Sequence, residues 1–309
     1  MEYNYSPLLK HPEKMPDIDP LNPGMRLILK ITVKTEQAKA ASFNAPEGCT
    51  IRDTSVTSSD GTELPVRIAE PADCTEETPG ILMIHGGAFY LPVSESALAL
   101  ACQYALRLNA RVYIPEYRLV PAFSAPKALE DCMAVWETMC REYGNDTGRL
   151  LIIGDSAGAA ITESICFLLR DQKKNMPAGQ LLIYPVADTN TEQYPSAVKY
   201  PDAVWSVTAT KHMWSGYLNG TDPKLIPTLV PLANSSFSNL PAAYIEPQEI
   251  DVLCDEGIAL AKKLEEAGVP VELSVIPASY HGFDSDLTSP LVQAAVERRV
   301  HAMERMLGI

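Results

Sequence analysis

The stretch LLIIGDSAGAA, residues 150–160, places four consecutive apolar residues directly before a turn of small residues that holds one acid and one serine. An apolar run that stops at a glycine is typical of a strand buried on both faces of a sheet. From Ala157 to Lys174 the spacing of apolar residues is helical. The stretch therefore predicts a buried strand, a sharp turn at Ser156 and a helix.

The same order of short apolar segment and longer helical segment recurs from residue 81 to the C-terminal end. The predicted strands are ILMIHG (81–86), RVYIPEY (111–117), LLIIG (150–154), QLLIYPV (180–186), AAYIEP (242–247) and VELSVIP (271–277). The predicted helices cover residues 97–110, 126–144, 157–174, 255–268 and 290–307. Continuously apolar strands separated by helices are typical of a parallel sheet covered on both faces. We therefore predict an α/β fold with a mostly parallel, doubly wound sheet.

The two edges of this sheet have their own signals. Residues 50–71 alternate apolar and polar side chains on each side of Asp60-Gly61, which predicts an antiparallel hairpin at one edge. The last strand, residues 271–277, could pair with its copy across a two-fold axis, because an edge strand has unpaired backbone groups. We note a homodimer formed through this strand as an expectation.

Two segments interrupt the alternation of strands and helices. They are residues 1–45 and residues 187–238, and the second is rich in Pro, Asn, Thr, Ser, Tyr and Trp and too long for a simple connection. We interpret them as two parts of a small helical cap over the carboxyl edge of the sheet, where ligands bind in such folds. The α/β core then comprises residues 46–186 and 239–309.

The charge of the 309-residue chain argues against two classes of partner. Its formal net charge is −14 at pH 7, and no run of Lys and Arg interrupts the acidic surplus. Such a surface repels nucleic acid and anionic lipid. Residues 1–16 do not have the pattern of a signal peptide, and no stretch approaches the roughly 18 apolar residues of a membrane span. We therefore predict a cytoplasmic protein without a membrane span.

The cysteines predict neither a disulfide framework nor a zinc site. The seven are odd in number and scattered, and none forms a C-x-x-C pair. Most should be buried thiols that pack as small apolar residues. Cys254 lies in a stretch of candidate acids described below.

Gly154 to Gly158 match G-x-S-x-G, the strand-to-helix turn that exposes a nucleophilic serine at the edge of a sheet. Glycines relieve crowding in this turn, and the serine itself is held in a strained conformation. A serine hydroxyl is a poor nucleophile at neutral pH, so it needs a base that a third group orients. We therefore predict Ser156 as a nucleophile with partners on other strand-end loops.

Five histidines are available as the base. Folds with this turn order the partners as serine, acid, histidine. Three histidines lie in the cap segments or ahead of the serine: His11, His212 and His85. His301 falls on the exposed side of the last predicted helix, whereas His281 follows the last predicted strand. We therefore predict His281 as the base.

The acid should lie on a strand-end loop between Ser156 and His281. The stretch after residue 247 supplies three candidates: Glu249, Asp251 and Asp255. Asp255 opens a predicted helix, where a carboxylate is explained by capping and by the helix dipole. We favour Asp251 because it has no such structural explanation.

Acyl transfer also requires fixed N–H donors that stabilise the negatively charged oxygen of the intermediate. The stretch HGGAF, residues 85–89, ends the first core strand, and its small residues let backbone N–H groups approach a substrate oxygen. Ala157, directly after the serine, offers another N–H. These positions are the predicted oxyanion hole.

Five motifs together resemble the hormone-sensitive-lipase-like esterases, also called family IV, a bacterial group of the α/β-hydrolase superfamily. They are HGGAF (85–89), PEYRLVPAFSAPKALEDC (115–132), GDSAG (154–158), D-x-L-x-D-E-G (251–257) and HGF (281–283). They occur in the order of the family and cover roughly residues 50 to 309. The resemblance implies a catalytic triad of Ser156, Asp251 and His281 in an α/β-hydrolase fold.

The resemblance also implies that the backbone N–H groups of Gly87 and Ala88, with those of Gly86 and Ala157, form the oxyanion hole. Ala88 stands where the family usually has a third glycine, so its methyl group narrows the space beside the scissile carbonyl. Val252 stands where proline is common, a departure that should matter little.

The combined interpretation is a serine carboxylesterase that acts on a small-molecule ester and needs no metal or organic cofactor. Aromatic side chains in the cap favour short acyl groups, from acetyl to about hexanoyl. The side chains that we place at the substrate pocket are His85, Phe89, Asp155, Trp205 and Trp214. Amide or peptide hydrolysis, a lyase reaction, or a ligand-binding role without catalysis stays open as an alternative.

Overall fold

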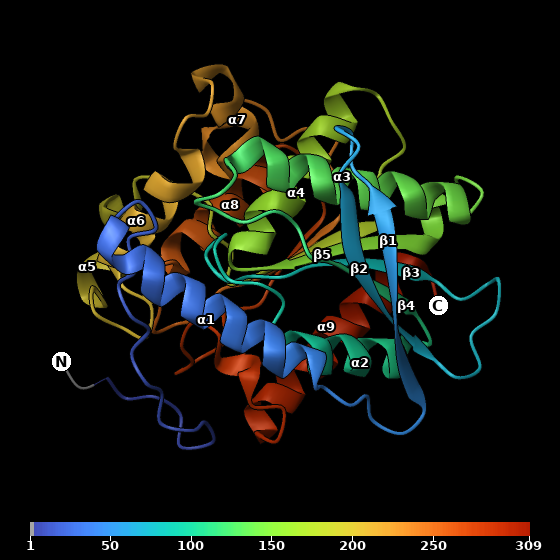
Figure 1. Ribbon diagram of the computed structural model, residues 1–309, viewed down its shortest axis with the longest axis horizontal. Coiled ribbons are helices and arrows are strands. Elements are labelled where there is room, and N and C mark those ends of the chain that lie inside the picture. The colour runs from blue at the N-terminus through green and yellow to red at the C-terminus, as the bar shows by residue number, and fades with distance from the viewer. Residues whose placement is uncertain (1–2) are drawn as a thin grey trace.

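Eight strands pair in one sheet within residues 3–309, the part of the chain that this computed structural model describes (Figure 1). The strands are β1 (Cys49–Thr57), β2 (Glu63–Pro71), β3 (Gly80–Ile84), β4 (Arg111–Pro115), β5 (Leu150–Asp155), β6 (Gly179–Ile183), β7 (Ala243–Glu246) and β8 (Val271–Leu273). Their order across the sheet is β1-β2-β4-β3-β5-β6-β7-β8. All neighbours from β4 to β8 are parallel, which confirms the predicted doubly wound fold.

The hairpin predicted around Asp60-Gly61 is present at the first edge of the sheet. β1 and β2 pair antiparallel from Cys49 opposite Pro71 to Thr57 opposite Glu63. Gly61 closes the turn at φ 84°, a backbone conformation that glycine adopts without a steric cost. β2 also pairs antiparallel with β4, so the hairpin extends the parallel sheet by two strands.

Helices cover both faces of the sheet. The α-helices of the described chain are α1 (Pro23–Ala41), α2 (Glu95–Leu108), α3 (Ala125–Glu142), α4 (Ala157–Asp171), α5 (Pro195–Lys199), α6 (Val207–Leu218), α7 (Ile226–Leu229), α8 (Cys254–Glu266) and α9 (Pro290–Leu307). α2 and α9 pack together on one face, whereas α3, α4 and α8 pack on the other. The five predicted core helices agree with α2, α3, α4, α8 and α9 to within three residues at each end.

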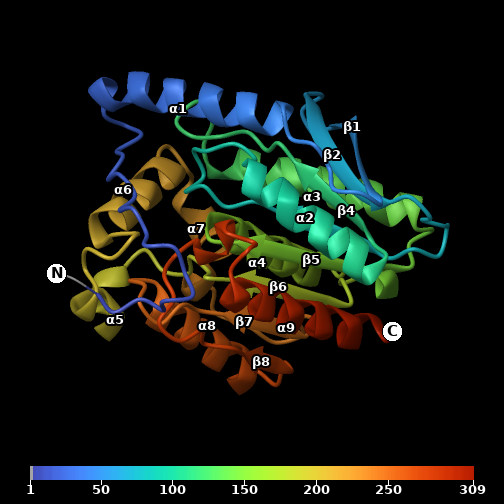
Figure 2. The ribbon, with the colours of Figure 1, turned by 90° about the horizontal axis from the view of Figure 1, so that it is seen from below.

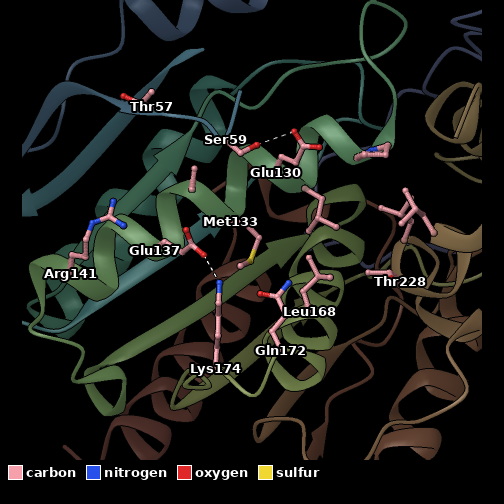
Figure 3. A pocket seen from close by; sticks show the side chains of 15 residues that line it. Thr57, Ser59, Glu130, Met133, Glu137, Arg141, Leu168, Gln172, Lys174 and Thr228 are labelled. Atoms are coloured by element: carbon pink, nitrogen blue, oxygen red, sulfur yellow. Dashed lines mark hydrogen bonds and ion pairs between the residues drawn. The ribbon is translucent and has the colours of Figure 1, made fainter. Parts of the chain in front are cut away.

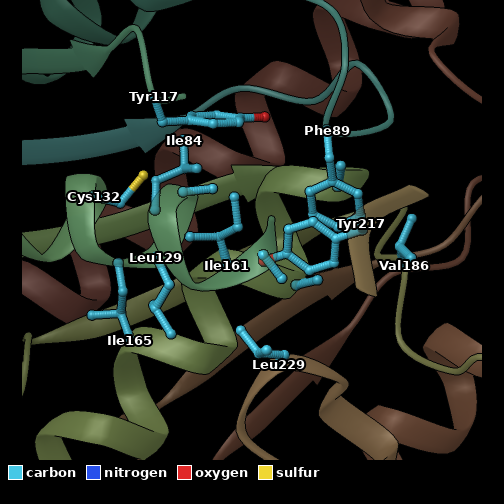
Figure 4. Packing of buried hydrophobic residues seen from close by; sticks show 14 of the residues in the cluster. Ile84, Phe89, Tyr117, Leu129, Cys132, Ile161, Ile165, Val186, Tyr217 and Leu229 are labelled. Atoms are coloured by element: carbon cyan, nitrogen blue, oxygen red, sulfur yellow. The ribbon is translucent and has the colours of Figure 1, made fainter. Parts of the chain in front are cut away.

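The apolar core lies in two layers, one on each side of the sheet. In the layer under α3 and α4, Leu129, Ile161 and Ile165 pack against Ile84 of β3 (Figure 4). The central strands β3 and β5 are buried along their length, which explains why their sequences show no alternation of polar and apolar residues. No helix of the described chain is both long and apolar enough to cross a membrane.

The chain before α1 lies beside α5 and α6 at one end of the molecule, and α1 runs from there toward the β1–β2 hairpin (Figure 2). The backbone N–H of Met15 donates to the carbonyl of Val204 at 2.8 Å, and the hydroxyl of Ser206 donates to the carboxylate of Asp17. Gly216 of α6 approaches Pro20 so closely that a Cβ there would lie 2.3 Å from the proline ring. These contacts are compatible with a two-part cap, and the division of the chain into cap and core stays a prediction.

The last strand is shorter than predicted. The sequence indicated residues 271–277, but β8 ends at Leu273, and only one isolated bridge, between Gln248 and Ile276, continues the pairing. β8 is an edge strand whose outer side has no partner in the described chain, and the side chains of Leu273 and of Val275, just beyond the strand, are exposed. Dimerisation through this edge stays a prediction.

Candidate active site

The chain makes an abrupt turn at Ser156, between the end of β5 and the first residue of α4. Ser156 has φ 53° and ψ −118°, a conformation that L-residues rarely adopt. Its N–H donates to the carbonyl of Ile183 at 2.9 Å, which ties the turn to the neighbouring strand β6. Such strain persists only where surrounding contacts hold it. The turn therefore has the form predicted from G-x-S-x-G.

The two glycines of the turn are required by close approach of the backbone. A Cβ on Gly154 would lie 2.3 Å from the carbonyl oxygen of Gly158, and a Cβ on Gly158 would lie 1.9 Å from that of Ile84. Neither contact can be relieved by rotating a side chain. The start of α4 therefore packs directly on the end of β3.

We expect Gly158→Ala to destabilise the fold by roughly 3 kcal/mol, because the new methyl group would force apart α4 and β3. Urea denaturation of the purified variant measures this change. Gly257→Ala in α8 is the matched control, since its Cβ would be 3.2 Å from the side chain of Pro247 and alanine favours a helix. Equal stability of Gly158→Ala and wild type would contradict the packing argument.

Ser156, His281 and Asp251 form a hydrogen-bonded row. Ser156 Oγ lies 2.9 Å from His281 Nε2, and His281 Nδ1 lies 2.7 Å from Asp251 Oδ2. A carboxylate only accepts, so Nδ1 carries the proton and Nε2 is free to accept one from the serine. All three side chains are buried, and Asp251 also accepts the N–H of Leu253 at 3.2 Å. The row can therefore move a proton from the hydroxyl to the imidazole.

The other two candidate acids are engaged elsewhere. Glu249 Oε2 accepts the N–H of Ala278 at 2.7 Å, and Asp255 Oδ2 accepts the N–H of Ser196 at 2.7 Å. Asp255 also stands in the first turn of α8, where its charge suits the helix dipole. Of the three candidates, the structure brings only Asp251 to the histidine.

The glycine loop after β3 presents two backbone N–H groups at the site. Gly87, Ala88 and Phe89 all have positive φ, at 103°, 54° and 63°. Gly87 and Ala88 line the cavity above Ser156, and their N–H groups have no acceptor within residues 3–309. Ala157 begins α4, so its N–H has no acceptor within the helix. These three N–H groups are therefore available to donate hydrogen bonds to an oxyanion.

The prediction that Gly86 donates to an oxyanion is corrected by the structure. The Gly86 N–H donates to Asp155 Oδ2 at 3.0 Å, so it is already occupied. A Cβ on Gly86 would lie 2.4 Å from the same oxygen, which explains why the position holds a glycine. The Asp155 carboxylate thus anchors the glycine loop to the serine turn. Its removal from water raises the pKa of Asp155 to about 7.

His85 is not part of the pocket wall, contrary to the prediction. Its ring stacks on Tyr117 at 4.3 Å between centroids, and its Nδ1–H donates to the Gly86 carbonyl at 2.7 Å. Tyr117 in turn donates to the His85 carbonyl at 2.9 Å. Burial lowers the pKa of His85 to about 4, so the ring is neutral. His85 supports the glycine loop from beneath.

Phe89 and Trp214 were also predicted in the pocket and lie outside its wall. Phe89 stacks on Tyr217 (Figure 4), and the two ring centroids are 3.6 Å apart; Trp214 packs against both rings. This aromatic cluster joins the glycine loop to α6. Trp205, by contrast, does line the cavity, and its ring lies 5.8 Å from that of His281.

The cavity over Ser156 has a volume of about 360 Å³ and mostly apolar walls. The N-terminal segment contributes Met15, Ile18 and Ile28, the loop after the glycine loop contributes Leu91, and α2 contributes Ala97 and Leu100. The sequence did not indicate these residues, because they lie in irregular or helical segments far from Ser156 in the chain and no sequence pattern distinguishes a residue that lines a pocket. Sequence reasoning also missed Tyr184 and Asp284, although a tyrosine directly after strand β6 and an acid beside HGF were visible signals.

A second cavity, of about 440 Å³, lies at the surface between α3, α4 and α7 (Figure 3). Its floor includes Met133 and Leu168, and an ion pair between Glu137 and Lys174 crosses it. Its lining includes the Ser59 hydroxyl, which donates to the Glu130 carboxylate at 3.2 Å, but no histidine.

The cysteines and acids of the described chain form no covalent or metal-binding cluster. All seven cysteines are free thiols, and residues 3–309 contain no group of three His, Cys, Asp or Glu side chains arranged to hold a metal ion. Burial raises the pKa of Cys254 to about 12, so this thiol near Asp251 is not a reactive thiolate.

Comparisons with known proteins identify the family to which this fold belongs. The alpha/beta hydrolase fold family matches residues 81–285. The chain is 31% identical to the ethyl acetate hydrolase of Pseudomonas putida over 255 residues, which is 80% of each protein. It superimposes on a bacterial heroin esterase with a TM-score of 0.83 at 28% identity, covering 95% and 94% of the two chains. A hormone-sensitive lipase from a metagenome library shares the fold, with a TM-score of 0.78 at 22% identity over 95% and 100%.

The resemblance to the hormone-sensitive-lipase-like esterases is therefore confirmed. The strained serine turn, the glycine loop and the parallel sheet are the parts of the structure on which it depends. The chain belongs to the alpha/beta hydrolase fold family and is a carboxylic ester hydrolase.

Proposed function

We propose that the protein hydrolyses short-chain carboxylic esters, from acetyl to about hexanoyl, through a Ser156–His281–Asp251 triad and an acyl-enzyme. The observation that carries the proposal is the pair of contacts from His281, 2.9 Å to Ser156 and 2.7 Å to Asp251, directly below a cavity. The base and its orienting acid are within hydrogen-bond reach without any rearrangement.

In the first half of the reaction, Ser156 Oγ attacks the ester carbonyl while His281 Nε2 takes its proton. Asp251 stabilises the imidazolium that forms. The backbone N–H groups of Gly87, Ala88 and Ala157 hold the oxyanion of the tetrahedral intermediate. The imidazolium then protonates the leaving alcohol as the carbon–oxygen bond breaks, which leaves the acyl group on the serine.

In the second half, water replaces the alcohol. His281 Nε2 takes a proton from water as the water oxygen attacks the acyl-enzyme carbonyl, and the same N–H groups hold the second oxyanion. The proton returns to Ser156 Oγ as the carboxylic acid leaves. Each step uses only side chains and backbone groups of this chain, with water as the co-reactant.

Three features favour a short acyl group. The cavity of about 360 Å³ is at the small end of the range for ligand pockets. Apolar walls from Ile18, Leu91 and Leu100 would accept hydrocarbon, and the methyl group of Ala88 narrows the space beside the carbonyl. The name of one relative, ethyl acetate hydrolase, describes a substrate with a two-carbon acyl group.

We expect kcat/KM for p-nitrophenyl esters to be highest between acetate and hexanoate. The value for laurate should be lower than this maximum by about tenfold or more. Initial rates across acetate, butyrate, hexanoate, octanoate and laurate measure this, with Ser156→Ala as the blank. A maximum at laurate would overturn the short-chain assignment. Faster turnover of the matched p-nitroanilide than of the butyrate ester would replace the esterase by an amidase.

A further inference from the structure

A charged cluster lies entirely inside the protein behind the triad, and it is centred on Arg299 of α9. The side chains of Arg299 and Glu246 are fully buried, and Asp284 is 6% exposed. Arg299 Nη2 lies 2.5 Å from Glu246 Oε1, and Arg299 Nη1 lies 2.7 Å from Asp284 Oδ2. Arg299 Nη1 also donates to Tyr104 Oη at 3.2 Å.

The two carboxylates belong to the segments that carry the acid and the base. Glu246 is the last residue of β7, which leads into the loop that holds Asp251. Asp284 lies in the short turn Phe283–Ser285 that directly follows His281 and Gly282. One guanidinium group thus joins the two loops, although neither Asp251 nor His281 touches it.

Tyr184 extends this connection to the imidazole itself. Its hydroxyl donates to Asp284 Oδ1 at 2.7 Å, and its ring meets the His281 ring edge to face with centroids 4.9 Å apart. Its backbone N–H donates to the Glu246 carbonyl at 2.8 Å. Tyr184 therefore stands between the cluster and the base, and both it and Asp284 line the substrate cavity.

Stability alone is a weak reason to keep such a cluster. Burying a guanidinium and two carboxylates carries a large desolvation cost, and well-packed apolar side chains often stabilise a core equally well. Each atom of the cluster is nevertheless satisfied, since Glu246 Oε2 also accepts the hydroxyl of Tyr244 at 2.8 Å. A fully satisfied polar network restricts the loops that it joins to one arrangement.

We propose that Arg299 is a positioning residue, which holds the Asp251 and His281 loops in register and balances the negative charge around the imidazole. The proposal rests on the proposed function, in which His281 is the base. It assigns Asp284 and Tyr184 as the link between Arg299 and His281.

The charged and titratable groups that face His281 determine in which direction each substitution should shift the acid limb of the pH profile. Asp251 comes from the β7 loop, Asp155 from the end of β5, Tyr184 from the end of β6 and Asp284 from the base loop itself. Arg299 is the positive charge among these groups. Its loss should favour the imidazolium, whereas loss of the Asp284 charge should disfavour it.

The test compares Arg299→Gln, Arg299→Lys, Asp284→Asn and the double variant Arg299→Gln/Asp284→Asn in kcat, KM and the pH dependence of kcat/KM on p-nitrophenyl butyrate. We expect Arg299→Gln to lower kcat about tenfold or more with KM nearly unchanged, because the triad loses its alignment. The acid limb of its pH profile should move up by about 0.5 to 1 pH unit. Asp284→Asn should move the limb down, and the double variant should return it toward wild type.

Arg299→Lys keeps the positive charge but loses the planar guanidinium group that binds both carboxylates. The acid limb of its pH profile should therefore match that of wild type even if its kcat falls. Arg298→Gln is the matched control, since Arg298 is the preceding residue on α9 and forms no ion pair within residues 3–309. All assays are run at least 10 °C below each variant's Tm, so that every preparation is folded.

The proposal is overturned if Arg299→Gln lowers Tm but keeps the kcat and the pH profile of wild type, because the cluster would then be only structural. If Arg299→Gln does not fold, Asp284→Asn and Tyr184→Phe decide, and unchanged kcat and acid limbs in both would reject it. Absence of ester turnover in the wild type would instead overturn the proposed function, so the two failures are distinguishable.

Discussion

Ser156→Ala should lower kcat for p-nitrophenyl butyrate by about a million-fold and leave the fold intact. The variant keeps the N–H donors of Gly87, Ala88 and Ala157 but has no oxygen for His281 to activate. Alanine fits the turn because Ser156 Oγ projects into the cavity and its hydrogen bond is to His281 alone. Steady-state rates and a thermal melt measure the two effects.

Ser164→Ala is the matched control for this experiment. Ser164 is a second buried serine on α4, and its hydroxyl donates to the Ala160 carbonyl at 2.7 Å, away from the cavity. Its loss should reduce stability by about 1 kcal/mol and leave kcat close to wild type. Ester turnover that survives in Ser156→Ala would show that another group attacks the ester, and the triad would have to be abandoned.

Asp251→Asn should lower kcat by about 10,000-fold, the second largest effect expected. The amide cannot stabilise the imidazolium, and its NH2 group can hold the ring in the wrong tautomer. The geometry would change little, because asparagine has the same shape as aspartate and its Oδ1 can still accept the N–H of Leu253. The measurement is kcat at a pH well above the acid limb, with the melting temperature as a check on folding.

Asp255→Asn is the control that separates the two aspartates. Asp255 accepts a hydrogen bond from the Ser196 backbone and stands in the first turn of α8, where its charge suits the helix dipole, so its replacement should reduce stability by about 1 kcal/mol and leave kcat near wild type. The reverse pattern, with a large loss in Asp255→Asn and a small one in Asp251→Asn, would identify Asp255 as the acid.

Local patterns were sufficient for the fold and the candidate nucleophile. Buried strands in a doubly wound sheet are apolar along their whole length, so β3 and β5 stand out in the sequence. The serine turn stands out as well, because only glycine can occupy positions whose Cβ would overlap the backbone of β3 or α4. Chain order then left His281 as the base, with Asp251 favoured among three acids.

Packing decided which neighbouring side chains reach the cavity. His85, Phe89 and Trp214 are close to the site in sequence or in the cap, yet each is turned into an aromatic stack beneath or beside it. Gly86 directly precedes Gly87 and Ala88, whose N–H groups are free, yet its own N–H donates to Asp155. No periodicity distinguishes a side chain that lines a cavity from one that packs behind it.

The sequence by itself determined the order of strands and helices, the strained turn at Ser156 and the residue types of the triad, because these depend on neighbours a few positions apart. Only the tertiary structure decided which groups act together: the walls of the substrate cavity, the anchoring of the glycine loop by Asp155, and the link from Arg299 through Asp284 and Tyr184 to His281. The physical reason is that these hydrogen bonds and ion pairs join residues as far as 125 positions apart in the chain, and only the folded sheet brings those residues together.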